Sequence, residues 1–127
     1  MIRYLIDSDC AVYAMAGMFP ALRERLAACA HDEVGISAIS FAEIALGSER
    51  GKPPSSKLLD AFVSRIPVLP FDEAAARSYA RLPFKRARFD RLLAAHAVSI
   101  GATVITNNAD DFADVPGLRV ENWTLPL

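Results

Sequence analysis

The sequence of 127 residues is poor in cysteine and has no long apolar segment. Its two cysteines, Cys10 and Cys29, lack C-x-x-C spacing, which argues against a zinc site and against a disulfide scaffold. The most apolar stretch, residues 11–22, is too short to cross a bilayer, and Arg3 and Asp7 interrupt any signal-peptide core. We therefore expect a reduced, cytoplasmic protein with no membrane span.

An excess of charge of one sign is missing as well. The chain has 14 Lys and Arg residues against 15 Asp and Glu, so at a formal net charge of -1 it has no overall field that attracts nucleic acid. Any contact with RNA or DNA must use a local patch. Hydrophobic residues make up 53% of the chain, enough for a sizeable core, and no internal repeat or interior linker interrupts it. We expect a single domain over residues 1–127.

Short apolar runs alternate with helical segments along the chain. Because two parallel strands need a helix-length connection, this order predicts an α/β fold in which helices cover both faces of a short, mostly parallel central sheet. Such a fold is a three-layer sandwich, and its ligands bind beyond the carboxyl ends of the strands. The expected strands are residues 2–6, 34–36, 67–71, 103–105 and 118–121, and the expected helices are residues 11–17, 21–30, 40–46, 57–66, 72–81 and 89–100.

Acidic residues occur where an expected strand ends or an expected helix begins. If their carboxylates meet, each pair about 4 Å apart repels by a few kcal/mol, so a bound cation or a proton must stabilise the group. Ligand sets made only of oxygen favour Mg²⁺ or Mn²⁺ over zinc. The acids in question are Asp7, Glu43, Asp90, Asp110 and Asp111.

Most of these acids also have a local structural interpretation. Ser40 and Glu43 have the S-x-x-E spacing of a capping box, and Asp90 falls in the first turn of its helix, where a negative charge is favourable. Asp7 is the exception. Residues 8–9 already offer caps to the helix that follows, which leaves Asp7 without a local stabilising role.

Four blocks of this sequence, taken together and in order, resemble the PIN-domain ribonucleases, and within them the VapC-type toxins of bacterial toxin–antitoxin pairs. The resemblance covers nearly the whole chain. It implies a PIN-like three-layer fold and a metal-dependent endoribonuclease. The blocks are YLIDSD at residues 4–9, ISAISFAEIALG at 36–47, FDRLLAAH at 89–96, and VITNNADDF at 104–112 followed by VPGLRVENW at 115–123.

The resemblance also implies roles for individual residues and partners. A Mg²⁺ ion, for which Mn²⁺ may substitute, would activate a water molecule that hydrolyses an RNA phosphodiester bond. A cognate VapB-type antitoxin would hold the toxin in check, and a homodimer is common in the family. By position, the metal carboxylates would be Asp7, Glu43 and Asp90, the fourth catalytic acid Asp111, and the supporting polar residues Asn108 and Thr106.

Two other functions stay open beside this one. Residues 5–9, LIDSD, also fit the strand and D-x-D motif of haloacid-dehalogenase-like phosphatases, but that family needs a later lysine near the site and none follows Lys85. The second is a PIN-like scaffold that has lost activity and serves as a binding module. Asn108 favours it, because the family often has Asp there. Metal binding through Asp7 and Asp90 would separate an active PIN domain from a degenerate one.

The one local concentration of basic residues lies in residues 81–91, beside Asp90, and could cradle an RNA backbone. A solvated basic loop is the alternative. We predict that replacing both Arg86 and Arg88 by Ala weakens RNA binding in a salt-dependent way, because each lost phosphate contact lowers the slope of log affinity against log salt by about 1. Equilibrium binding of labelled RNA at several salt concentrations measures this slope. An unchanged slope would count against the patch.

Overall fold

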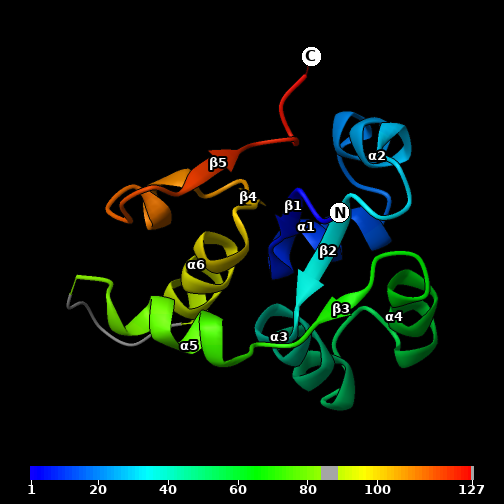
Figure 1. The fold of residues 1–127 in the computed structure, drawn as a ribbon. Helices are drawn as coiled ribbons and strands as arrows, with labels where there is room; N and C mark the ends of the chain where they lie inside the picture. The colour runs from blue at the N-terminus through cyan, green and yellow to red at the C-terminus, as the bar shows by residue number, and fades with distance from the viewer. Residues whose placement is uncertain (84–88, 127) are drawn as a thin grey trace.

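The computed structural model describes residues 1–83 and 89–126 (Figure 1). Its five strands form one sheet in the order β3-β2-β1-β4-β5, and each neighbouring pair is parallel. The prediction of an α/β fold with a short parallel central sheet is therefore confirmed. The strands are β1 (Tyr4–Ile6), β2 (Val34–Ser37), β3 (Val68–Leu69), β4 (Thr103–Ile105) and β5 (Arg119–Glu121).

Among the described residues, two helices lie in each of the first three crossovers between consecutive strands, and the 3₁₀ helix η1 lies in the last. This pattern satisfies the need of parallel strands for long connections. Within the described part of the chain, no helix has the length and apolar character needed to cross a membrane. The helices are α1 (Ser8–Met15), α2 (Pro20–Ala28), α3 (Ala38–Glu49), α4 (Ser56–Val63), α5 (Glu73–Ala80), α6 (Phe89–Ile100) and η1 (Ala109–Phe112).

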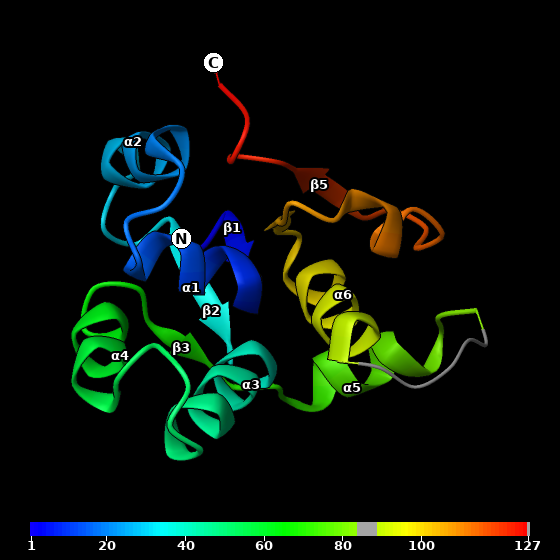
Figure 2. The same ribbon diagram turned by 180° about the vertical axis from the view of Figure 1, so that it is seen from behind.

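Side chains of the strands alternate between the two faces of the sheet. Ile6 and Ile105 pack on one face, in a core shared with residues of α1, α2, α3 and α4. Leu5 and Val104 pack on the other face, against α6, which in turn packs against α5. Figures 1 and 2 show α5 and α6 side by side and away from α2 and α4, so the three-layer sandwich is present as expected.

The path of the chain across the sheet changes direction at β1. Strands β2 and β3 lie on one side of β1, and β4 and β5 lie on the other. In such sheets, ligands bind at the crevice beyond the carboxyl ends of the two strands where the direction changes, here β1 and β4. Asp7 follows β1 and Thr106 follows β4, and the Asp7 N–H donates to the carbonyl of Ile105 at 3.0 Å. The topology therefore places two of the expected site residues at this crevice.

The start of α3 differs from the prediction. We expected Ser40 to cap this helix with Glu43 as its capping-box partner, but the helix begins at Ala38. Ser37 is the cap, and its Oγ accepts the Ile39 N–H at 3.1 Å. The reason is that Ser37 is still paired in the sheet as the last residue of β2, so the helix starts directly after it. Glu43 lies in the second turn and has no capping role.

Candidate metal centre

Asp7 lies directly after β1 and is buried, with 8% of its surface exposed. Its Oδ1 accepts the Cys10 N–H at 2.8 Å, which makes Asp7 the N-cap of α1. The expectation that Asp7 has no local role is wrong, because α1 begins at Ser8, too early for Ser8 or Asp9 to cap it. Burial raises the pKa of Asp7 above its ordinary value, and hydrogen bonds from Thr106 and Cys10 oppose this rise in part.

Thr106, Asn108 and Asp111 form a hydrogen-bonded turn after β4. Thr106 is fully buried, and its Oγ1 accepts the Asn108 N–H at 3.0 Å. The side-chain amide of Asn108 donates to the carboxylate of Asp111, which lies on η1. Thr106 also bonds to Asp7. The two residues expected to give polar support thus contact the first and the fourth acid of the predicted site.

Glu43 approaches the same crevice from α3. It is partly buried, and the Ser8 hydroxyl donates to its Oε1 at 3.4 Å. Burial raises the pKa of Glu43 most, and the negative charge of Asp90 adds to the rise. The hydrogen bond from Ser8 opposes it, while Asp9 and Asp7 contribute further small increases. Glu43 therefore lies within electrostatic reach of three other carboxylates.

Asp90 is supplied by the first turn of α6, the helix on the opposite face of the sheet. The pKa of Asp90 is raised most by burial. The charge and the hydrogen bonding of Asp111 raise it further, and the charges of Asp7 and Asp9 add smaller increases. The structure therefore links four of the five acids singled out from the sequence electrostatically, namely Asp7, Glu43, Asp90 and Asp111. The fifth, Asp110, is exposed on η1.

The chemistry of this donor set fits a hard divalent cation. The groups that meet are carboxylates, and oxygen ligands suit Mg²⁺ or Mn²⁺ rather than zinc. The charge of Asp90 raises the pKa of Glu43, and the charges of Asp111 and Asp7 raise that of Asp90, so a cation bound among these groups would relieve the repulsion. Over residues 1–83 and 89–126, no three acidic, histidine or cysteine side chains already lie close enough to hold an ion. Binding would have to draw the carboxylates together, and the ligand assignment stays a prediction.

Asp9 is a fifth acid at this site, and we did not expect it. It is exposed in the first turn of α1, and its charge contributes to the raised pKa values of Asp7, Glu43 and Asp90. The available signal was its position two residues after Asp7, which we interpreted as a possible helix cap and as part of the D-x-D motif of another family, not as part of this site. Asp9 thus adds negative potential to the site.

The expected RNA-binding residues Arg86 and Arg88 lie outside the described residues. Arg91, from the same basic stretch, is buried, with 7% of its surface exposed. Its Nη1 donates to both carboxylate oxygens of Asp114 at 3.2 Å, and its Nη2 donates to the Pro83 carbonyl at 3.1 Å. Counting Arg91 in a phosphate-binding patch was therefore wrong, because its guanidinium is engaged inside the fold.

Comparison with known proteins supports the assignment that the geometry suggests. The family model described as the PIN domain matches residues 4–118. Among curated relatives, the tRNA(fMet)-specific endonuclease VapC of Shigella flexneri is 32% identical, over 98% of this chain and 100% of the relative. The protein of the same name from Salmonella typhimurium is 30% identical, over 97% of this chain and 99% of the relative.

Solved structures give the same picture. The crystal structure of VapBC2 from Rickettsia felis, bound to a DNA fragment from its promoter, contains a chain that matches with a TM-score of 0.85 and 29% identity. That match covers 97% of this chain and 99% of the other. DNA-bound VapBC from Salmonella typhimurium matches with a TM-score of 0.83 and 27% identity, over the same shares of the two chains.

Asp7→Asn should make the metal-free protein more stable. The raised pKa of Asp7 means that the folded state holds the proton more tightly than the unfolded state, so stability falls as the pH rises above the ordinary Asp pKa. Asn keeps an oxygen that can cap α1 and removes the charge. Thermal denaturation in EDTA at pH 7 should show a higher Tm, by about 4 °C for each kcal/mol gained, and a smaller gain near pH 4.

The control for this stability measurement is Asp60→Asn, which removes an exposed carboxylate of α4. It should leave the Tm nearly unchanged, because a solvated charge has no desolvation cost. A Tm for Asp7→Asn at or below that of the parent protein would show that the buried charge is not destabilising.

Proposed function

The chain belongs to the PIN-domain family, in its VapC group, and we propose that it is an endoribonuclease that acts as the toxin of a VapBC toxin–antitoxin module. One observation carries the proposal. Four acids from four separate segments of the chain lie within electrostatic reach of one another near the switch point of the sheet, beyond the carboxyl ends of β1 and β4. A purely structural role does not explain why carboxylates that repel one another are gathered there.

The chemistry proposed for this site is phosphodiester hydrolysis with Mg²⁺ as cofactor and Mn²⁺ as a substitute. When bound, the ion polarises the phosphate and makes a water molecule a stronger nucleophile. Asp7 would hold it from the end of β1, in an orientation set by the Cys10 N–H and by Thr106. Glu43 and Asp90 would complete the ligand set from the helices on either face. Asp111, oriented by the Asn108 amide, would act as the fourth acid.

The substrate we propose is RNA, and a transfer RNA is the first to test. Both curated relatives with at least 30% identity are described as tRNA(fMet)-specific endonucleases. RNA sequence is read chiefly in single-stranded loops, where unstacked bases are accessible, so the anticodon loop and other loops of a transfer RNA are suitable targets. The homodimer and the cytoplasmic location stay predictions.

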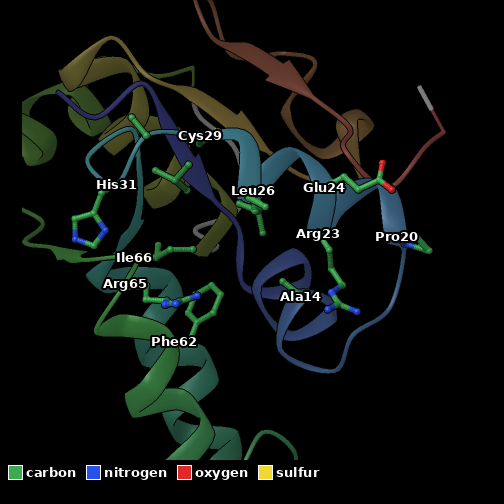
Figure 3. A pocket seen from close by; sticks show the side chains of 13 residues that line it. Ala14, Pro20, Arg23, Glu24, Leu26, Cys29, His31, Phe62, Arg65 and Ile66 are labelled. Atoms are coloured by element: carbon green, nitrogen blue, oxygen red, sulfur yellow. The ribbon is translucent and has the colours of Figure 1, made fainter.

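The partner we propose is a VapB-type antitoxin that docks in a groove between α2 and α4. The groove has a volume of about 890 Å³. Figure 3 shows Leu26 of α2 on one side and Phe62 of α4 on the other, with the charged Arg65 beside Phe62. An apolar floor with charged margins suits an amphipathic helix. The matching structures from Rickettsia felis and Salmonella typhimurium are of VapBC, which supports this choice of partner.

The test of the proposed activity is cleavage of a defined RNA panel, led by transfer RNAs, with Mg²⁺ or Mn²⁺. We expect the parent protein to cut and EDTA to stop it. Asp7→Asn should lower the rate by at least about a thousandfold, because it removes a carboxylate from the proposed ligand set while the cap of α1 is kept. Circular dichroism and Tm would show that this variant is folded.

Equal cutting by the parent protein and Asp7→Asn would indicate a contaminating nuclease. A parent protein that neither cuts any RNA nor binds Mn²⁺ would contradict the proposed function. The result would then favour the inactive binding module that Asn108 left open.

The antitoxin groove is tested by Ala27→Arg. Ala27 is exposed and lines the groove, so a long charged side chain can be added there without disturbing the core. An antitoxin helix would have to bury this charge, and we expect at least about tenfold more antitoxin to be needed for half-inhibition of cleavage. Ala76→Arg, at an exposed position on α5, is the matched control. Equal inhibition of the two variants would place the antitoxin elsewhere.

A further inference from the structure

A buried hydrogen bond joins the two helical segments that carry Glu43 and Asp90. The Nδ1 of His96 lies 2.7 Å from the Oγ of Ser37. Both residues are inaccessible, with 2% and 0% of their surfaces exposed. They are 59 residues apart in the sequence, so this bond belongs to the tertiary structure rather than to either helix alone. Neither residue contributes a carboxylate to the site, and the proposed chemistry does not use them.

The hydroxyl of Ser37 can serve both helices at once. It accepts the Ile39 N–H at 3.1 Å and so caps α3. Its own proton remains to be donated to His96, whose imidazole has an acceptor nitrogen when neutral. Burial lowers the pKa of His96, with a small opposing contribution from Asp72, and this favours the neutral form.

The imidazole ring is held from a second side as well. Phe71 meets it edge to face, with ring centroids 5.7 Å apart and an interplanar angle of 87°. The ring is thus fixed between the end of β2 and the segment that follows β3. Because the ring is held on two sides, its bond to Ser37 can fix the position of α6 relative to the start of α3.

The bond between Ser37 and His96 lies at equal sequence distances from Glu43 and Asp90. Glu43 lies six residues after Ser37, and Asp90 lies six residues before His96. Six helical residues rise about 9 Å, so each acid is about 9 Å along its helix from the bond. The bond joins the start of α3 to α6, and these two helices are in contact, so a change in the angle between them would move both carboxylates.

We propose that His96, held by Ser37, is a positioning residue that sets the separation of Glu43 from Asp90 and thereby the affinity of the site for its divalent cation. This inference rests on the proposed function. Because the acids are not already gathered into a cage, the free energy of bringing them together is part of the free energy of metal binding. Mutation of residues that orient the metal ligands without touching the metal lowers metal affinity or activity by about 10–100-fold.

The first experiment compares Ser37→Ala with Ser55→Ala. Both remove the hydroxyl that caps a helix, since Ser55 caps α4 by accepting the Leu58 N–H at 3.2 Å, but only Ser37 also bonds to His96. Mn²⁺ binding is measured by electron paramagnetic resonance, and kcat and KM are measured on the RNA that the parent protein cuts. We expect Ser37→Ala to weaken Mn²⁺ binding about tenfold and to lower kcat by a similar factor, with KM within about twofold. Ser55→Ala should change none of the three.

The second experiment tests the bond from the other side. His96→Leu removes the ring nitrogen, whereas the side-chain amide of Asn in His96→Asn places a polar group near the position of Nδ1. We expect His96→Leu to reproduce the losses of Ser37→Ala, and His96→Asn to recover most of the Mn²⁺ affinity and kcat. If His96→Leu fails to fold, the comparison of the two serine variants still decides the question.

The outcomes separate this inference from the proposed function. Unchanged Mn²⁺ affinity in Ser37→Ala, or equal losses in Ser37→Ala and Ser55→Ala, would overturn the positioning role while RNA cleavage by the parent protein stands. Equal losses in folded His96→Leu and His96→Asn would also overturn it, because packing rather than the hydrogen bond would then matter. A parent protein without Mn²⁺ binding or cleavage would overturn both.

Discussion

Repulsion among carboxylates gathered at the end of β1 is the constraint on which the rest of the site depends. Asp7 is the clearest case, because its burial disfavours the charged form and raises its pKa. The protein offsets part of this cost with hydrogen bonds to the same carboxylate, from the Cys10 N–H and from Thr106. Those bonds also fix its direction. A residue that costs stability in the metal-free state is therefore held rigidly where a cation would need it.

Two of the remaining acids come from the two outer layers of the sandwich. Glu43 belongs to a helix that packs in the core shared by α1, α2, α3 and α4, whereas Asp90 belongs to α6 on the opposite face. Their distance depends on how the two layers are placed relative to each other at the carboxyl end of the sheet. A contact that joins the two layers at this end, such as the bond between Ser37 and His96, therefore affects the distance between Glu43 and Asp90.

The sequence predicted those features that depend on local pattern. The helix from Phe89 to Ile100 and its end at Gly101, which has φ +70°, follow from apolar spacing and from the conformational freedom of glycine. The predicted cap of α3 was wrong because Ser37 and Ser40 are equally suitable N-cap residues when only the local sequence is considered. The pairing of β2 with β3 decides between them, and a single sequence does not reveal that pairing. Likewise, the buried position of the Arg91 guanidinium depends on its hydrogen bonds to Asp114, which is 23 residues away in the sequence.

The dispersed arrangement of the acids connects stability with function. A cage already closed would place charges closer together and cost more in the metal-free protein, since repulsion rises as the separation falls. An open arrangement costs less but requires the ligands to converge when the ion binds. The free-energy cost of this convergence is small only if the helices that carry Glu43 and Asp90 are already held near their final positions. A fixed bond between neutral groups behind the acids achieves this without adding charge to the site.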